Sequence, residues 1–194
     1  MRKLCLLFLL IGTYCYAGER KYTVDSPDGK IQLAIIQTDA GELTYQLSVK
    51  RKQVIDASAL GFKTEDGLTF PFRGWKMGKV TRNKVNSVWK PLWGKRAVVP
   101  DKYNEMKLSF VNEAKSSDAL EVVARAYNEG VAFRYVSPQD AGSALELTTF
   151  NFAGDYTAWF YNGERHNIGP ERLTETDGER LPVMTVKAAD DLYL

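Results

Sequence analysis

Short runs of alternating apolar and polar residues recur along most of the chain. Between residues 43 and 49 the apolar positions are two apart, which is the period of a half-buried strand: Leu43, Tyr45, Leu47 and Val49. Residues 30–36 and 150–161 are also rich in the aliphatic, β-branched and aromatic residues that strands favour. No window of a dozen residues carries a sustained helical stripe. The pattern predicts about a dozen strands and no long helix.

Turn residues separate these runs. Ser26-Pro27-Asp28-Gly29 is a proline-first turn, and Asn128-Glu129-Gly130 separates two β-prone segments at residues 120–127 and 131–136. We expect a tight hairpin there, with Gly130 at positive φ. Further turns or breaks are expected at residues 50–52, 66–67, 71, 74, 78, 94 and 100.

Many short strands with frequent turns predict an all-β chain, folded as a large antiparallel β-sandwich. There are more candidate strands than an immunoglobulin-like pair of sheets needs. No linker, repeat or low-complexity tract divides residues 18–194, so they are expected to form one domain. Asp191-Leu192-Tyr193-Leu194 opens a new strand at the last residues, and the chain is therefore expected to be the truncated N-terminal part of a longer protein.

Residues 1–17 have the order of a secretory signal peptide. Arg2 and Lys3 precede an apolar run at residues 4–11, and the segment ends at the small residue Ala17. The run is too short to span a membrane as a helix. We expect cleavage after Ala17 and an exported, periplasmic protein. Lipid attachment at Cys15 is the alternative, but Tyr14 is bulkier than the residue that usually precedes such a cysteine.

Removal of this segment changes the composition. Cys5 and Cys15 leave with it, and the remaining residues carry equal numbers of basic and acidic side chains. A neutral chain without a basic tract is not expected to bind nucleic acid. The 12% of aromatic residues suits neutral ligands such as sugars, although a β core alone would also explain them.

Signatures of catalysis are scarce. His166 is the only histidine, so histidine pairs, Ser-His-Asp triads and multi-histidine metal sites are not expected. A pair of carboxylates could still hydrolyse a glycoside, but the sequence does not single out such a pair. We therefore assign no catalytic residue and no metal ligand, and favour binding or scaffolding.

Two segments could contact a ligand. Trp89 and Trp93 could stack on sugar rings, or they could be core residues that cap the sandwich, which is the interpretation we favour. The second segment, residues 162–171, is a dense polar loop that follows an aromatic strand, and a rigid sheet often positions binding groups on such loops. Its candidate substrate-binding residues are Asn162, Glu164, His166 and Asn167; the alternative is a solvated connector.

Several segments together resemble the N-terminal domain of glycoside hydrolase family 97. The most specific of them is Arg125-Ala126-Tyr127-Asn128-Glu129-Gly130-Val131-Ala132-Phe133-Arg134-Tyr135. The others, in matching order, are Ser26-Pro27-Asp28-Gly29-Lys30, Leu60-Gly61, Trp93-Gly94, Tyr103-Asn104-Glu105, Phe150-Asn151-Phe152 and Ala158-Trp159. The resemblance extends from about Tyr22 to Leu194.

The resemblance implies a fold and a function. Members of the family are exported bacterial α-glucosidases or α-galactosidases with a galactose-mutarotase-like super-sandwich, a catalytic (β/α)8 barrel and a calcium ion at the active site. The implied partners are an α-linked oligosaccharide or glycoside and the barrel that would follow Leu194. The barrel's carboxylates and a calcium-binding glutamate are expected after Leu194, so the resemblance implies no catalytic residue and no bound calcium for this chain alone. Its expected role is to pack on the barrel and help wall the substrate pocket.

Three other functions stay open. A free-standing sugar-binding module is the main alternative. A mutarotase-like enzyme would have to use His166 as its acid or base, and a purely structural sandwich would bind no ligand at all.

Overall fold

The computed structural model describes residues 19–114, 119–137, 142–161, 163, 167–178 and 180–194. These residues form strands, turns and one 3-10 helix, η1 (Leu173–Glu175), and no α-helix occurs among them. All of the strand pairings are antiparallel. The prediction of an all-β antiparallel fold is confirmed.

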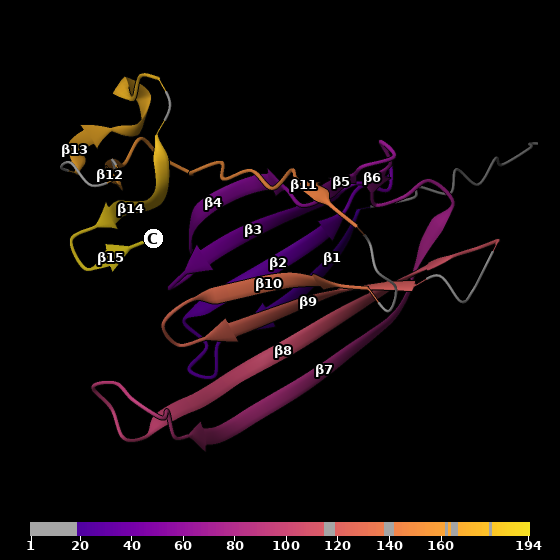
Figure 1. Ribbon diagram of the computed structural model, residues 1–194, viewed down its shortest axis with the longest axis horizontal. Helices are drawn as coiled ribbons and strands as arrows, with labels where there is room; N and C mark the ends of the chain where they lie inside the picture. Colours follow the sequence, from indigo (N-terminus) through magenta and orange to yellow (C-terminus); the bar gives the residue numbers. More distant parts are fainter. Residues whose placement is uncertain (1–18, 115–118, 138–141, 162, 164–166, 179) are drawn as a thin grey trace, which may run out of the picture.

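Two four-stranded sheets face each other and form a sandwich (Figure 1). The first has the order β1-β2-β3-β4 and consists of β1 (Arg20–Asp25), β2 (Ile31–Gln37), β3 (Leu43–Val49) and β4 (Lys52–Ala59). The second has the order β10-β9-β8-β7 and consists of β7 (Trp75–Trp89), β8 (Val99–Asn112), β9 (Ala119–Tyr127) and β10 (Val131–Val136). Neighbours in each sheet are consecutive in sequence, so the frequent turn signals are those of hairpins.

Two smaller sheets complete the fold. One joins β11 (Ala144–Glu146), β5 (Phe62–Thr64) and β6 (Thr69–Phe70), in that order. The other, here named the C-terminal sheet, has the order β13-β12-β14-β15 and contains β12 (Thr157–Tyr161), β13 (Ile168–Arg172), β14 (Leu181–Ala189) and β15 (Leu192–Tyr193). It lies beside one end of the sandwich (Figure 1).

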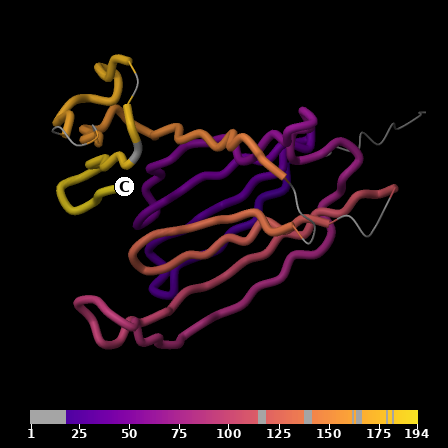
Figure 2. Tube along the Cα trace, viewed as in Figure 1, coloured from indigo at the N-terminus to yellow at the C-terminus, as the bar shows by residue number. Residues whose placement is uncertain are grey.

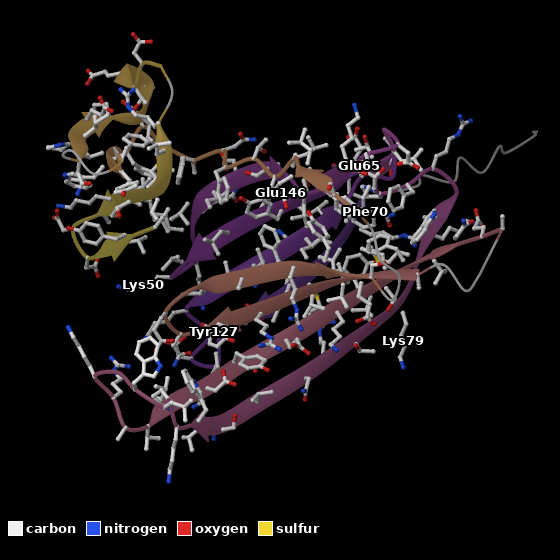
Figure 3. All side chains as sticks on the ribbon, viewed as in Figure 1. Lys50, Glu65, Phe70, Lys79, Tyr127 and Glu146 are labelled. Carbon is white, nitrogen blue, oxygen red and sulfur yellow. The ribbon has the colours of Figure 1, made fainter. Side chains whose placement is uncertain are left out.

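The core lies between the two large sheets. Strand alternation places Leu33 and Ile35 of β2 opposite Leu108 and Val122 of the second sheet, and all four are fully buried. Each such side chain contributes about 1.5–3 kcal/mol on burial, before conformational entropy is subtracted. Phe70, near the end of the sandwich that lies away from the C-terminal sheet (Figure 3), extends the core into the small sheet.

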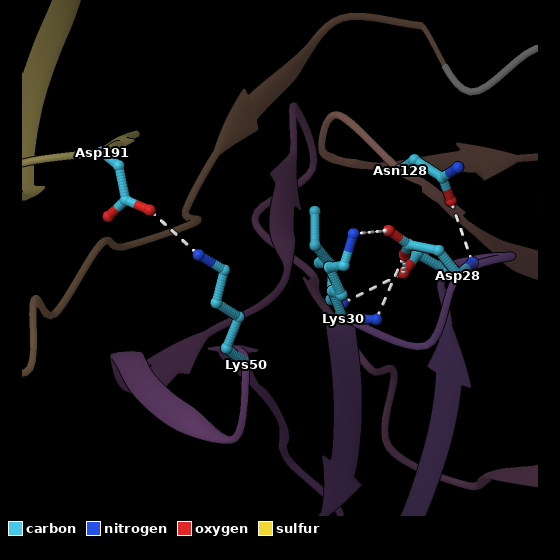
Figure 4. Close-up of polar contacts among 7 residues, drawn as sticks. Asp28, Lys30, Lys50, Asn128 and Asp191 are labelled. Atoms are coloured by element: carbon cyan, nitrogen blue, oxygen red, sulfur yellow. Dashed lines mark hydrogen bonds and ion pairs between the residues drawn. The ribbon is translucent and has the colours of Figure 1, made fainter.

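The first turn is held by its own side chains and by a strand hairpin from the other sheet. Ser26 Oγ donates a hydrogen bond to Asp28 Oδ1 at 2.7 Å, and Lys30 Nζ lies 2.9 Å from Asp28 Oδ2. The Asp28 N–H donates to Asn128 Oδ1 at 3.0 Å (Figure 4). This last bond ties the β1–β2 turn to the β9–β10 hairpin.

The central hairpin forms where the sequence predicts it, but its geometry differs. The Tyr127 N–H donates to the Gly130 carbonyl at 2.8 Å, so only Asn128 and Glu129 lie outside the ladder. Gly130 does not have a positive φ, and the prediction of a left-handed conformation there is wrong. The loop is one residue shorter than expected, so it needs no left-handed third position.

The β3–β4 turn uses the left-handed conformation instead. Lys50 has a φ of 49° and Arg51 a φ of 68°, between the paired residues Val49 and Lys52. Two-residue hairpins with positive φ at both central positions match the twist of their strands, but usually carry Asn or Gly there. The sequence lacks that signal.

An extended stretch at residues 147–153, here named the edge segment, runs along the outer side of β4 (Figure 2). The Thr149 N–H donates to the Ala59 carbonyl at 3.1 Å, and the Asp56 N–H donates to the Asn151 carbonyl at 2.7 Å. The Asn151 N–H also donates to Ser58 Oγ at 2.9 Å. The edge segment thus closes this edge of the first sheet and leads the chain to the C-terminal sheet.

Strands β7 and β8 form a long hairpin arm that extends past the sandwich (Figure 1). Expected breaks at Gly78 and Pro100 are wrong, because both residues lie inside these strands. Gly78 falls where the register shifts between Met77 and Val80, and Pro100 lies opposite Val88 near the end of the arm. Bulges and strand ends accept Gly and Pro, so neither residue ends the ladder.

Candidate functional site

The predicted sugar-facing loop connects β12 to β13. Asn162, Glu164 and His166 lie outside the described residues, so the structure does not show whether they come together. Asn167 is described and exposed, directly before β13. Of the four candidate residues, only Asn167 can therefore be placed.

The strands at the base of this loop are well packed. Ala158 and Phe160 of β12 are buried, and Phe160 pairs with Ile168 of β13. Gly169 has a φ of 120°, and a Cβ at this position would lie 2.5 Å from the Ala158 carbonyl oxygen. The close approach of the two strands therefore requires glycine at position 169.

A cleft of about 750 Å³ lies between the C-terminal sheet and the end of the sandwich. Its walls are mostly apolar: Ile31, Tyr45, Leu47, Phe133 and Phe152 line one side, and Phe160, Val183, Met184, Val186 and Leu194 line the other. Val183 is 77% exposed, which is unusual for a valine in a strand. The cleft therefore leaves apolar strand faces uncovered in the described part of the chain.

Few polar groups reach this cleft. Arg180 forms an ion pair with Glu171 at 3.2 Å, and its guanidinium carbon lies 5.8 Å from the centre of the Phe160 ring. The Tyr45 hydroxyl donates to the Thr149 carbonyl at 2.8 Å, and burial raises the pKa of Tyr45 to about 12. Tyr45 is thus neutral at physiological pH. The cleft suits an apolar protein segment better than it suits a sugar.

One ion pair connects the two sides of the cleft. Lys50 Nζ, from the β3–β4 turn, lies 2.9 Å from Asp191 Oδ2, from the β14–β15 turn (Figure 4). Its hydrogen bond and charge lower the pKa of Asp191. Both side chains are largely exposed, and an exposed pair of this kind contributes less than about 1 kcal/mol. The pair therefore contributes little to the stability of the contact between the two sides.

A polar cluster lies on the outer face of the second sheet, opposite the core. Glu105 of β8 is buried and accepts a hydrogen bond from Arg125 Nε of β9 at 2.7 Å. The Arg125 guanidinium carbon lies 4.2 Å from the centre of the Tyr103 ring, and that ring lies 5.0 Å from the Tyr127 ring. Burial raises the pKa of Tyr103. These four residues are neighbours across β8 and β9 and hold the base of the arm.

The tryptophan segment lies at the end of the arm. Trp89 is 53% exposed and Trp93 is 87% exposed, so the interpretation of these residues as a cap on the core is wrong. The reason is that β7 and β8 are longer than the strands of the opposing sheet and extend past its end. No strand of the first sheet reaches far enough to cover them.

Two further properties follow from the described residues alone. They contain no group of three Asp, Glu, His or Cys side chains arranged to hold a metal ion. They also contain no helix with the length and hydropathy needed to cross a membrane.

An all-β sandwich with apolar faces left uncovered at its end and on its arm is typical of a domain that packs against another domain. The family model described as Glycosyl-hydrolase 97 N-terminal matches residues 24–188. The chain belongs to this family, and the resemblance that its sequence suggested is confirmed.

Relatives and solved structures agree with this assignment. The chain is 23% identical over 199 aligned residues to a retaining alpha-galactosidase of Bacteroides thetaiotaomicron, and 29% identical over 166 to a probable retaining alpha-galactosidase of Streptomyces bingchenggensis. A family 97 glycoside hydrolase from Pseudoalteromonas sp. strain K8, solved with panose, is 34% identical with a TM-score of 0.61. A beta-arabinopyranosidase structure is 27% identical with a TM-score of 0.60.

The chain matches only part of each relative. The two alignments with the galactosidases cover 93% and 82% of this chain but 29% and 26% of those proteins. The alignments with the two solved structures cover 72% of this chain and 22% of each of those chains.

Sequence reasoning missed the cluster of Glu105 and Arg125, although both residues lie in segments that carry the family resemblance. A signal was present, because a charged residue on a strand face predicts an opposite charge on the neighbouring strand. The sequence indicates the long exposed arm more weakly. Only the absence of any break between Lys79 and Trp89 indicates such a long strand.

Proposed function

We propose that this chain is the N-terminal domain of an exported α-glycosidase that hydrolyses terminal α-glucosides or α-galactosides. The domain packs on a catalytic barrel and helps to wall the substrate pocket, and it does not catalyse hydrolysis alone. The family match over residues 24–188, in a chain that spans 29% of a retaining alpha-galactosidase, carries this proposal.

The geometry supports a packing role. The described residues leave apolar side chains exposed on the cleft and on the arm, which a packed neighbouring domain would cover. The only carboxylate buried in the described part of the fold, Glu105, is engaged by Arg125. That pair has a structural role and is not offered as an acid or base.

The family resemblance implies calcium at the active site of the complete enzyme. The described residues do not bring together three Asp, Glu, His or Cys side chains as metal ligands. We therefore derive no catalytic step through calcium for this chain.

The β12–β13 loop is proposed to line the pocket. Its candidate residues, Asn162, Glu164, His166 and Asn167, offer hydrogen-bond donors and acceptors, which neutral sugar hydroxyls require. The packed strands at its base support this proposal, because they would fix the position of the loop. Contact with the substrate would be through hydrogen bonds and not through catalysis.

The test uses the complete enzyme with Glu164→Ala and His166→Ala together, assayed on a short α-glycoside. The loss of one hydrogen bond costs roughly 0.5–1.5 kcal/mol, so kcat/KM is expected to fall several-fold while the melting temperature stays unchanged. Unchanged kinetics on both α-glucosides and α-galactosides would show that the loop is only a connector.

A free-standing sugar-binding module is the second candidate function. The exposure of Trp89 and Trp93 favours it, because exposed aromatic rings can stack on sugars. Calorimetric titration of the purified chain with panose distinguishes the two. Binding by the chain alone would favour the module, and its absence favours a domain that needs its barrel.

The proposed site of action is the periplasm, reached through a signal peptide cleaved after Ala17. N-terminal sequencing of the protein recovered from the periplasm tests this. A mature chain that begins at Gly18 is expected, and a full-length chain in the cytoplasm would contradict it.

A further inference from the structure

The end of the β7–β8 arm carries a concentrated apolar surface. We name residues 88–98 the arm tip. Its five large apolar side chains are 45–100% exposed: Val88, Trp89, Leu92, Trp93 and Val98. Large apolar side chains that gather on one exposed loop usually mark a surface that binds another molecule.

The arm holds this surface in a fixed place. Strands β7 and β8 are paired without interruption from Val80 and Leu108 to Trp89 and Val99, where the tip begins. The tip lies clear of the other sheets (Figure 1). The paired strands hold the two ends of this loop in place, which lowers the entropic cost of binding a partner there.

The charges of the arm tip indicate the chemistry of the surface that it could bind. Lys90, Lys95 and Arg96 are exposed around the apolar residues, and no Asp or Glu occurs between residues 88 and 100. None of the side chains at positions 88–98, all of which are described, forms a hydrogen bond or ion pair. A complementary surface would be an apolar hollow with carboxylates at its rim.

A neutral sugar fits this surface less well. Sugar rings stack on aromatic faces, but Leu92 is 100% exposed and Val98 is 45% exposed, and neither offers a stacking face. The three cations would also have no counterpart in an uncharged oligosaccharide. A protein surface accounts for the whole set.

We propose that the arm tip docks on the catalytic region of the same enzyme, with Leu92 and Trp93 inserted into an apolar hollow rimmed by Asp or Glu. This inference rests on the proposed function, in which such a region exists. The chain spans 29% of its galactosidase relative, so the relative has ample further chain to supply a partner of this kind.

Thiol labelling tests the docking directly. Residues 18–194 contain no cysteine, so Leu92→Cys introduces a single thiol into this domain. Because residue 92 is fully exposed, the substitution should not disturb the fold. In a chain of residues 18–194 this thiol is expected to react rapidly with a maleimide, and in the complete enzyme its reaction should be slowed at least roughly 10-fold.

Reversing the three positive charges of the arm tip tests whether its docking site is rimmed by Asp or Glu. Lys90→Glu, Lys95→Glu and Arg96→Glu, added together to Leu92→Cys in the complete enzyme, should restore most of the rapid labelling. Leu145→Glu is the matched control, because Leu145 is an exposed leucine of β11, outside the arm, and its replacement should leave the introduced thiol protected. High salt should weaken the protection only where the three basic side chains are retained.

The outcomes separate this inference from the proposed function. A complete enzyme that hydrolyses α-glycosides while its introduced thiol reacts as fast as in the isolated chain would overturn the docking and leave the proposed function standing. A complete protein without glycosidase activity would overturn the proposed function. Panose quenching of tryptophan fluorescence in the isolated chain, abolished by Trp93→Ala, would show a sugar platform and also overturn the docking.

Discussion

Glu105 is the only charged side chain buried among the described residues, and Arg125 accounts for its position. A buried carboxylate is costly unless it is paired and hydrogen-bonded. The Arg125 guanidinium also packs on Tyr103, so it serves both as a cation and as a flat apolar surface. Arg125 of β9 thus contacts two side chains of the neighbouring strand β8.

Replacing Arg125 by Ala should therefore be costly. The substitution removes the hydrogen-bonded partner of the buried Glu105 carboxylate and leaves only Lys107 Nζ, 3.9 Å from Glu105 Oε1. We expect the free energy of unfolding to fall by about 1–3 kcal/mol. Chemical denaturation measures this change. The double variant Glu105→Gln with Arg125→Met should lose less than Arg125→Ala alone, and an equal or larger loss would mean that packing, not charge, dominates the site.

Two glycines should differ in how well they tolerate substitution. A Cβ at Gly61 would lie 2.5 Å from the Phe70 carbonyl oxygen, so Gly61→Ala is expected to destabilise the fold by about 1–3 kcal/mol. Gly130 has open space and no positive φ, so Gly130→Val should change the melting temperature little. Thermal unfolding of both variants checks the contrast, which a large loss for Gly130→Val would contradict.

Asp28 should make the fold sensitive to acid. Hydrogen bonds from Ser26 and Lys30, together with the charge of Lys30, lower the pKa of Asp28 from 3.8 to about 2. Because the folded pKa is the lower one, the stabilisation is present above the unfolded value and is lost as the pH falls toward the folded value. Asp28→Asn should flatten the decline of melting temperature between about pH 4 and pH 2. Parallel curves for the variant and the wild type would exclude this role.

At the scale of the element, the β3–β4 turn is strained by the residues that form it. Positive φ costs a non-glycine residue roughly 1–2 kcal/mol, and Arg51 has no hydrogen bond or ion pair among the described residues to offset this. Arg51→Gly should stabilise the protein by about 0.5–1 kcal/mol, after the added freedom of the unfolded chain is subtracted. Arg51→Ala is the control and should not stabilise. Equal melting temperatures for wild type and Arg51→Gly would show that the turn is not strained.

At the scale of the molecule, the proposed division of labour predicts an inactive chain. Purified residues 18–194 should hydrolyse neither aryl α-glucosides nor aryl α-galactosides, with or without calcium, because the proposed catalytic carboxylates belong to a separate region. Release of the aryl group measures this. Turnover that one acid-to-amide substitution within the chain abolishes would contradict the proposed function.

The sequence predicted the class of the fold because alternation and turn residues are local signals. The hairpin at Asn128 and Glu129 was found for that reason, whereas the conformation of Gly130 depends on a register that local residues do not determine. The exposure of Trp93 was missed because burial depends on whether an opposing sheet reaches that far. The candidate loop had no comparable test, since three of its four residues lie outside the described ranges.

The edge segment has a consequence for how the fold is assembled. Its backbone hydrogen bonds join residues 54–61 to residues 147–153, which lie about ninety positions further along the chain. Until those later residues are in place, β4 presents a row of unpaired amides and carbonyls, the kind of strand edge on which other chains can add. Truncation before residue 147 should therefore leave a sandwich that polymerises through the exposed edge of β4. In the folded protein the edge segment occupies the hydrogen-bonding groups of that edge and so prevents another chain from adding there.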